Sequence, residues 1–217
     1  MLPLIVPAIL TDNFNSFKEQ LQKLTKDFSS IQIDVMDGLF VDNKSFSERE
    51  QVSDLNSEAY FELHLMVKNP MSEVGLWSNV ANVTSAVFHI ESDVDPEECI
   101  RHIRNHGWKV GLALNPETPL AQALPYLNLV DELLFMTVRP GHQGSPFIPE
   151  VLEKIKEFKA LKLDITCSVD GGINEATIKS AVEAGAEKLY IGSAFFKADD
   201  PAVAHENLIK AIGEITI

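Results

Sequence analysis

The chain has 217 residues and a formal net charge of −14, from 18 basic and 32 acidic side chains. An acidic surface repels a phosphate backbone, so we do not expect nucleic acid as a partner. With 45% apolar and 23% charged residues and no low-complexity linker, the composition predicts one folded domain over residues 1–217.

The first ten residues are apolar but contain two prolines and no basic leader. We therefore expect neither a signal peptide nor a membrane-spanning helix, no membrane partner, and a cytoplasmic location. Cys99 and Cys167 are the only cysteines, too few for a disulfide framework. Cys167 lies in an apolar segment, which is typical of a buried thiol.

Eight short segments have the apolar, β-branched composition of strands. In chain order they are residues 4–10, 31–37, 60–67, 86–92, 109–115, 132–138, 165–171 and 188–195. Other segments have apolar residues three and four positions apart, as amphipathic helices do. These are residues 15–28, 96–107, 149–161, 174–185 and 201–215, with a weakly periodic sixth at 47–59.

Alternation of strand and helix predicts a parallel sheet covered by helices, and eight such units in one domain predict a closed (β/α)8 barrel. An open doubly wound sheet is the alternative. That fold usually has fewer strands and a G-x-G-x-x-G turn after the first strand, which this chain lacks.

Several predicted strands carry polar side chains or methionines on the face that we expect to point into the barrel. These residues are Gln32, Asp34, Met36, Glu62, His64, Met66, Met136, Thr166, Ser168 and Asp170. Barrel interiors usually hold branched apolar residues, and active sites lie at the carboxyl ends of the strands. Inward carboxylates there favour a functional site, although a structural ion network, such as His64 with Asp34, and methionine core packing are alternatives.

Asp34 and Asp170 are predicted to face each other across the barrel mouth, because their strands are three steps apart around a ring of eight. One carboxylate could remove a proton next to a carbonyl, and the other could return a proton to the opposite face of the planar intermediate. Such a pair inverts a stereocentre, so we predict that these two residues are catalytic.

Glycine-rich loops follow the last three predicted strands. Gly171, Gly172, Gly192 and Ser193 are predicted to bind a phosphate, since loops seven and eight of such barrels commonly do. The loop at 139–147, with Gly141 and Gly144, is predicted to close over the substrate. Each loop alone is more often a tight turn, and the proximity of Asp170 strengthens the prediction.

Motifs along nearly the whole chain resemble those of the ribulose-phosphate 3-epimerase family. They are PAIL (7–10), DVMDGLFVDN (34–43), HLMV (64–67), NP (69–70), FHIE (88–91), KVGLALNPET (109–118), MTVRPGHQGSPF (136–147), VDGG (169–172) and IGSA (191–194). The resemblance implies a (β/α)8 isomerase of the pentose phosphate pathway that interconverts ribulose 5-phosphate and xylulose 5-phosphate. It also implies catalysis by Asp34 and Asp170, an enediolate region lined by Met36, Met66 and Met136, and a homo-oligomer.

The resemblance further implies a divalent zinc or iron ion, for which three family ligands match Asp34, His64 and Asp170. The fourth ligand in the family is a histidine, and this chain has Gln32 there. Because a neutral amide is a poorer ligand than imidazole, we expect the metal to be held weakly, through three residues and water, or to be absent.

Other positions also differ from the family pattern. Ala8 replaces a serine, Asp42 replaces a proline, and the loop at 139–147 has fewer glycines. Arg139 and His142 are additional in that loop; they could bind a second anionic group, but an ordinary exposed loop is favoured.

Three functions are compatible with these residues. The first is a ketose-phosphate 3-epimerase in which the Gln32 amide helps to stabilise the oxyanion. The second is a related aldol-type or decarboxylase barrel enzyme, which would carry a D-x-K-x-x-D pattern absent from "DVMD". The third is a catalytically inactive barrel that binds a sugar phosphate. The replacement of the family's histidine by Gln32 and of its serine by Ala8 favours this function, whereas the presence of both aspartates argues against it.

Overall fold

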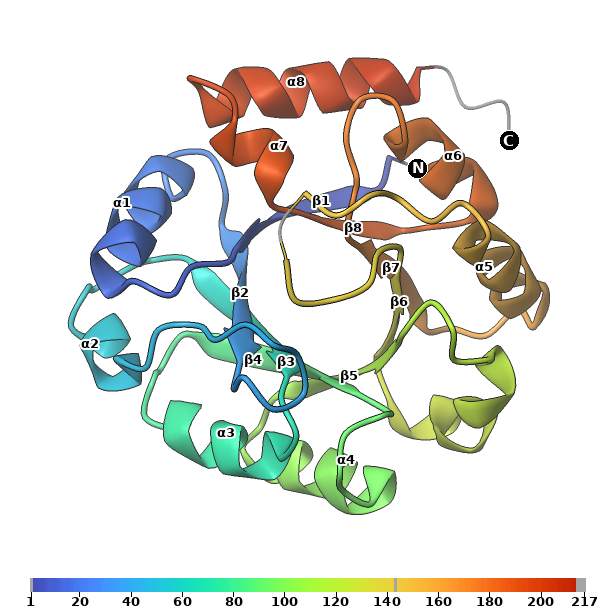
Figure 1. The fold of residues 1–217 in the computed structure, drawn as a ribbon, viewed down its shortest axis with the longest axis horizontal. Helices are drawn as coiled ribbons and strands as arrows, with labels where there is room; N and C mark the ends of the chain where they lie inside the picture. Colours follow the sequence, from blue (N-terminus) through green and yellow to red (C-terminus); the bar gives the residue numbers. More distant parts are fainter. Residues whose placement is uncertain (1, 143, 214–217) are drawn as a thin grey trace.

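Residues 2–142 and 144–213 are described by a computed structural model, in which eight parallel strands form a closed barrel in the order β1 to β8 (Figure 1). β8 pairs with β1, which completes the ring. The strands are β1 (Leu4–Ile9), β2 (Ser30–Met36), β3 (Tyr60–Met66), β4 (Val83–His89), β5 (Lys109–Leu114), β6 (Glu132–Met136), β7 (Thr166–Asp170) and β8 (Lys188–Ile191). The predicted (β/α)8 barrel is confirmed, and the open sheet is excluded.

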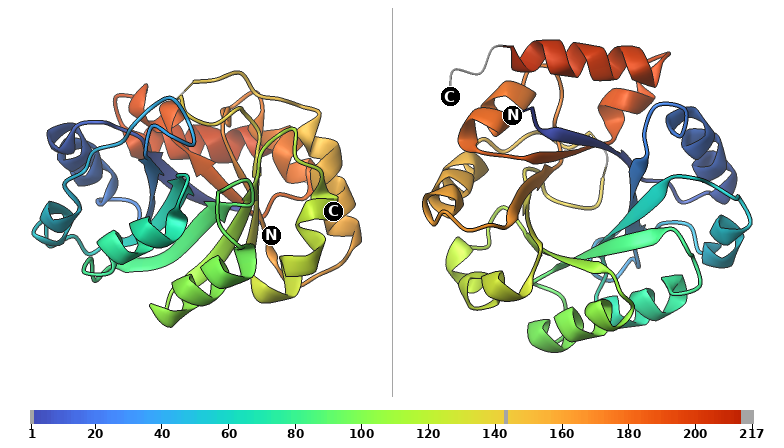
Figure 2. Two further views of the ribbon diagram at one scale, coloured as in Figure 1. Left: turned by 60° about the horizontal axis from the view of Figure 1, so that its bottom comes forward. Right: turned by 180° about the vertical axis from the view of Figure 1, so that it is seen from behind.

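Helices surround the barrel in both end-on views (Figures 1 and 2). They are α1 (Phe14–Leu24), α2 (Arg49–Ser53), α3 (Pro70–Trp77), α4 (Pro96–Asn105), α5 (Val151–Ala160), α6 (Ile178–Ala184), α7 (Ser193–Phe196) and α8 (Pro201–Ile212), with the 3-10 helices η1 (Leu120–Gln122) and η2 (Leu124–Leu129) after β5. Helices α3, α4 and α8 begin with a capping Asn or Asp followed by proline, a strong start signal. No helix in the described part of the chain is long and apolar enough to cross a membrane.

The helix prediction at 47–59 was too long, since only Arg49–Ser53 is helical. Asn56 has a positive φ of 47°, a left-handed conformation that a helix cannot continue through. The predicted helix 174–185 begins only at Ile178, because Asn174 and Thr177 form a hydrogen-bonded turn before it.

The last predicted strand, 188–195, was also too long. It ends at Ile191, and Ser193–Phe196 form the short helix α7. The fourth strand begins at Val83, three residues before the predicted start. The last helix ends at Ile212 with Gly213 as its cap, and the remainder of the predicted segment, Glu214 and Ile215, lies outside the described residues.

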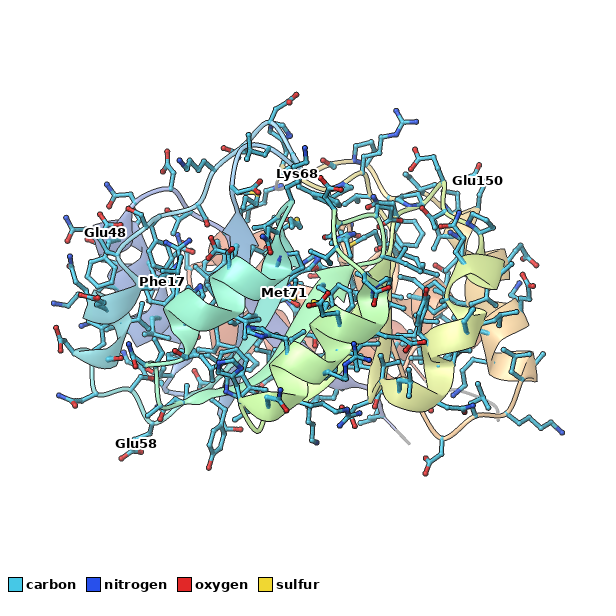
Figure 3. All side chains as sticks on the ribbon, turned by 90° about the horizontal axis from the view of Figure 1, so that it is seen from below. Phe17, Glu48, Glu58, Lys68, Met71 and Glu150 are labelled. Atoms are coloured by element: carbon cyan, nitrogen blue, oxygen red, sulfur yellow. The ribbon has the colours of Figure 1, made fainter. Side chains whose placement is uncertain are left out.

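Two apolar cores lie on opposite sides of the barrel wall. The larger lies between sheet and helices; it contains Ile31, Ile33 and Val35, and Phe17, labelled in Figure 3, is fully buried in it. The smaller core consists of the inward residues Val6, Ala8, Val87, Ala113, Leu134, Met136, Val138 and Tyr190. The strand faces predicted from alternation are therefore the faces that the structure has.

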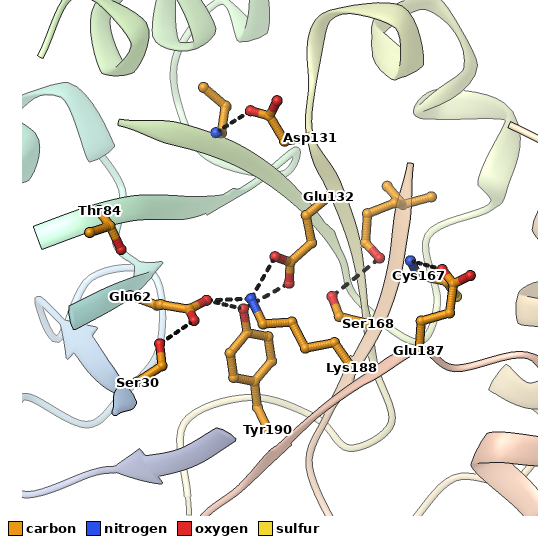
Figure 4. Close-up of polar contacts among 12 residues, drawn as sticks. Ser30, Glu62, Thr84, Asp131, Glu132, Cys167, Ser168, Glu187, Lys188 and Tyr190 are labelled. Atoms are coloured by element: carbon orange, nitrogen blue, oxygen red, sulfur yellow. Dashed lines mark hydrogen bonds and ion pairs between the residues drawn. The ribbon is translucent and has the colours of Figure 1, made fainter. Parts of the chain in front are cut away.

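A buried ion network lies inside the amino end of the barrel (Figure 4). Lys188 pairs with Glu62 and lies 3.1 Å from Glu132, and the Tyr190 hydroxyl lies 2.8 Å from an oxygen of each glutamate. Ser30 donates a 2.6 Å hydrogen bond to Glu62. Burial alone would raise the pKa of Glu62, but the charge of Lys188 and the hydrogen bonds from Lys188, Ser30 and Tyr190 together hold this pKa below its usual range. Glu62 therefore belongs to a structural cluster at the end of the barrel opposite the strand carboxyl ends.

Candidate active site

Three buried side chains converge at the carboxyl ends of β2, β3 and β7. Asp34 on β2 pairs in register with His64 on β3. Nδ1 of His64 lies 3.1 Å from Oδ1 of Asp34 and 3.0 Å from Oδ2 of Asp170. One potential ligand atom from each residue lies within 4.8 Å of the others. The two aspartates predicted to face each other thus meet at a single imidazole.

Gln32 also contacts both carboxylates. Its Nε2 atom donates hydrogen bonds to Asp34 Oδ1 at 2.9 Å and to Asp170 Oδ2 at 2.7 Å. Its Oε1 atom is buried and has no hydrogen-bond partner among the described residues. A buried carbonyl oxygen normally has a partner, so this atom is an unused acceptor beside the site.

Charges in the cluster shift the pKa values of two of its members. Burial would lower the pKa of His64, but hydrogen bonds and charge from Asp170 and Asp34 outweigh it and raise this pKa to about 9. Burial, with the charge of Asp170, raises the pKa of Asp34 to about 6, although the hydrogen bond with His64 opposes the rise. At neutral pH the metal-free site therefore has a positive imidazolium between its two acids.

A second histidine lies directly behind His64. Nε2 of His64 is 3.0 Å from Nε2 of His89, and Nδ1 of His89 is 3.3 Å from Oε2 of Glu91. Sequence reasoning assigned no role to these residues, although they form the motif FHIE at the end of β4. Alternation from the inward Val87 would have placed His89 on the inner face beside the predicted site.

A cavity opens at this end of the barrel, and most predicted site residues line it. They are Asp34, His64, Met66, Met136, Gly141, Gly144, Asp170, Gly171, Gly172, Gly192 and Ser193. Met36 is buried and pairs in register with Met66, but it is not among the described residues that line the cavity. Sequence reasoning did not single out several further lining residues, which are Leu10, Pro140, Ser145, Ile173 and Tyr190.

The glycines after β7 are required by their backbone conformation. Gly171 and Gly172 have φ values of +106° and +65°, which residues with a Cβ rarely adopt. A Cβ at Gly172 would lie 3.0 Å from Cα and Cβ of Phe147. These glycines let the loop after β7 pass close to the loop after β6, at the cavity.

Positions that depart from the family pattern lie in or near the same cavity. Ala8 lines it and pairs in register with Gln32, so the two departures are neighbours. His142 also lines the cavity. Arg139 is 79% exposed and its Nε atom lies 2.7 Å from Glu117, as expected for an ordinary surface residue.

A model of the ribulose-phosphate 3-epimerase family matches residues 4–196. Ribulose-phosphate 3-epimerase of Mycobacterium tuberculosis is 36% identical over 220 residues, which cover 99% of this chain and 95% of that protein. The enzyme of Methanocaldococcus jannaschii is 38% identical, covering 94% of this chain and 88% of its own. A cytoplasmic isoform from rice is 32% identical, covering 96% and 93%.

Solved structures with the same fold have much lower identity. KGPDC from Streptococcus mutans aligns with a TM-score of 0.75, 15% identity and full coverage of both chains. The 3-hexulose-6-phosphate synthase of Salmonella typhimurium aligns with a TM-score of 0.72 and 17% identity, covering 97% of this chain and 98% of that one. At these identities the likeness supports the barrel fold alone.

Proposed function

The chain belongs to the ribulose-phosphate 3-epimerase family, and from this membership we propose that it is an isomerase that inverts carbon 3 of a ketose phosphate. Ribulose 5-phosphate is the substrate that its relatives' names indicate. The observation that carries the proposal is the placement of Asp34 on β2 and Asp170 on β7, with both carboxylates in one cavity and hydrogen-bonded to Gln32. The absence of a D-x-K-x-x-D pattern weighs against an aldol or decarboxylase reaction.

The two carboxylates divide the proton transfer between the faces of the substrate. One removes the proton from carbon 3, which lies next to the carbonyl, and leaves a planar enediolate. The other donates a proton to the opposite face, so the configuration is inverted. Both N–H groups of Gln32 are engaged by the two acids, so Gln32 holds the carboxylates in position, and the expected donation of its N–H to the intermediate's oxygen would require one of these hydrogen bonds to break.

The substrate's phosphate is proposed to lie against the loops after β7 and β8. Gly171, Gly172, Gly192 and Ser193 line the same cavity as the two acids, and glycine allows a close approach of the backbone. Gly141 and Gly144 lie in the loop after β6 and line the same cavity, where a segment could cover a bound sugar.

The donor atoms present fit a divalent cation. Two carboxylates and Nδ1 of His64 converge as three ligands, and three protein ligands with one open position are common in catalytic metal sites. A bound cation would supply positive charge to stabilise the enediolate oxygen. The Nε2 group of Gln32 has no lone pair to offer to a cation. The Oε1 atom of Gln32, which has no hydrogen-bond partner among the described residues, is a harder metal ligand than imidazole. We therefore propose that this site prefers Mn²⁺ or Fe²⁺ to Zn²⁺ more than a site with two histidines does.

The function is tested by following carbon-3 hydrogen exchange in deuterium oxide for both epimers. The parent protein should epimerise the ketose phosphate and incorporate deuterium. In Asp34→Asn and in Asp170→Asn, the rate of epimerisation should fall by about 10²-fold to 10⁴-fold. Each variant should still exchange the carbon-3 hydrogen of one epimer only. Exchange of both epimers in both variants would exclude the two-acid mechanism. No exchange by the parent with any ketose phosphate would contradict epimerase activity.

Location and assembly are also proposed from the relatives. The rice relative is described as a cytoplasmic isoform, and we propose the same location for this chain. We also propose a homo-oligomer, which light scattering of the purified protein would detect as a mass above 24.1 kDa.

A further inference from the structure

Two buried histidines and a glutamate form a continuous row from the active site to the edge of the barrel. His64 and His89 are fully buried, and their ring centroids lie 5.2 Å apart with an interplanar angle of 21°. Because the two Nε2 atoms are 3.0 Å apart, the rings lie end to end in nearly one plane. This is the geometry of a direct hydrogen bond between the rings, so one Nε2 atom carries a proton and the other accepts it.

Glu91 determines the direction of that hydrogen bond. Its Oε1 atom accepts a 2.9 Å hydrogen bond from the Asn115 backbone N–H and another from the Thr118 hydroxyl, while Oε2 faces Nδ1 of His89. Burial by itself would raise the pKa of Glu91, but the hydrogen bonds from His89 and Thr118 hold it below its usual range. An ionised carboxylate only accepts hydrogen bonds, so the proton between Glu91 and His89 is on Nδ1 of His89.

The buried position of His89 sets the tautomer of His64. His89 is fully buried, the ring of Phe40 is centred 4.8 Å away, and the carboxylate of Glu91 contacts it at Nδ1. A second proton on Nε2 would place a buried positive charge against the His64 ring, which is costly. With its one proton on Nδ1, His89 presents a lone pair at Nε2. His64 must then carry a proton on its own Nε2, and its Nδ1 atom is the one that faces Asp34 and Asp170.

We propose that His89 and Glu91 are positioning residues that fix the tautomer of His64. They keep the Nε2 atom of His64 protonated, so that its Nδ1 atom, which faces the two catalytic carboxylates, is the atom that holds a proton or a divalent cation. The catalytic significance of this arrangement rests on the proposed function, whereas the arrangement itself does not. A neighbour that holds the second nitrogen of a metal-binding histidine commonly raises metal affinity by about 10-fold to 100-fold.

Nuclear magnetic resonance of protein labelled with ¹⁵N-histidine tests the tautomers at pH 7 without metal. The parent should show His89 protonated on Nδ1 only, and a slowly exchanging Nε2 proton on His64. His64 and His89 are assigned among the six histidines from the spectra of His64→Gln and His89→Gln. A proton on Nε2 of His89 in the parent would overturn the proposal, whether or not the protein is an epimerase.

Substitutions at His89 separate positioning from simple packing. In His89→Leu the His64 Nε2–H loses its acceptor, so its slowly exchanging proton signal should disappear and the dissociation constant for Mn²⁺, measured by calorimetry, should rise about 10-fold to 100-fold. His89→Gln retains an acceptor oxygen and should keep both properties within a few-fold of the parent. His205→Leu, on the outer helix α8, is the matched control and should leave both unchanged.

Glu91→Gln keeps the shape of the row but removes the charge that directs it. The amide can either donate or accept, so the His89 signals should show a mixture of both tautomers. A parent-like spectrum of Glu91→Gln, or parent-like metal affinity in folded His89→Leu, would contradict the proposal. A parent that shows the predicted tautomers but no carbon-3 exchange would contradict only the proposed function.

Discussion

Gln32 donates to both of the proposed catalytic acids through one nitrogen atom, with Nε2 at 2.9 Å from Asp34 and 2.7 Å from Asp170. Two carboxylates this close to one donor repel each other, and the amide together with His64 offsets that repulsion. The residue that replaces a family metal ligand is therefore a structural link between the two acids.

We predict that Gln32→His converts the site to one that favours Zn²⁺. A second imidazole adds a ligand that Zn²⁺ prefers to an amide, so the dissociation constant should fall by at least about tenfold, equivalent to about 1.4 kcal/mol. Competition with a chromophoric chelator at pH 7 measures it. Gln32→Leu is the control, since it removes the amide without adding a ligand. An affinity no higher than that of the parent would show that this position does not limit metal binding.

We predict that the metal-free protein loses stability as pH rises from about 6.5 to 9. The pKa of His64 is raised from 6.5 to about 9 in the folded chain, so its contribution is fully present below the lower value and lost through the higher one. Urea unfolding in the presence of a chelator, at several pH values, measures this loss. His64→Gln should lack this pH-dependent loss, and a parent curve that is flat over the same range would contradict the assignment.

We predict that Lys188→Met destabilises the protein by about 3–5 kcal/mol, because Glu62 and Glu132 would be left as uncompensated buried charges. Denaturant unfolding measures the loss. Lys210→Met, at an exposed ion pair on α8, is the control and should change stability by less than about 0.5 kcal/mol. A loss at Lys188 as small as that of the control would mean that the network contributes little.

We predict that Gly172→Ala raises the KM for the phosphorylated substrate about tenfold or more. A methyl group at φ +65° would press on Phe147 and displace the proposed phosphate loop. Steady-state kinetics measures this effect. Gly75→Ala is the matched control, because Gly75 lies in α3 with open space around it; it should leave KM unchanged and stabilise the protein by about 0.5–1 kcal/mol. An unchanged KM in folded Gly172→Ala would exclude this loop from phosphate binding.

Alternation along strands was sufficient to predict the barrel and to place Asp34, His64 and Asp170 on its inner face. It works because each strand has only two faces, and apolar Ile31, Ile33 and Val35 identify the outer one. Boundaries at strand ends were less accurate, since Ser193–Phe196 are apolar enough for a strand but follow Gly192 into a short helix.

Contacts between side chains of distant strands could not be predicted in the same way. The link from Gln32 to Asp170 spans 138 residues, and the pairing of His64 with His89 depends on how two rings turn inside the barrel. Glu62 was placed on the inner face, but its bond with Lys188 requires knowing which strands meet at the amino end.

The inside of the barrel is divided by its apolar middle layer into two polar compartments. Among the described residues Lys188 is the only buried lysine, and it is paired at the amino end with Glu62 and Glu132. With Val6, Leu134 and other apolar residues between, this cation cannot serve as a counterion for Asp34 and Asp170. Asp34 and Asp170, at the carboxyl end of the barrel, must therefore obtain their positive charge from His64 or from a cation or substrate group that enters the cavity at that end.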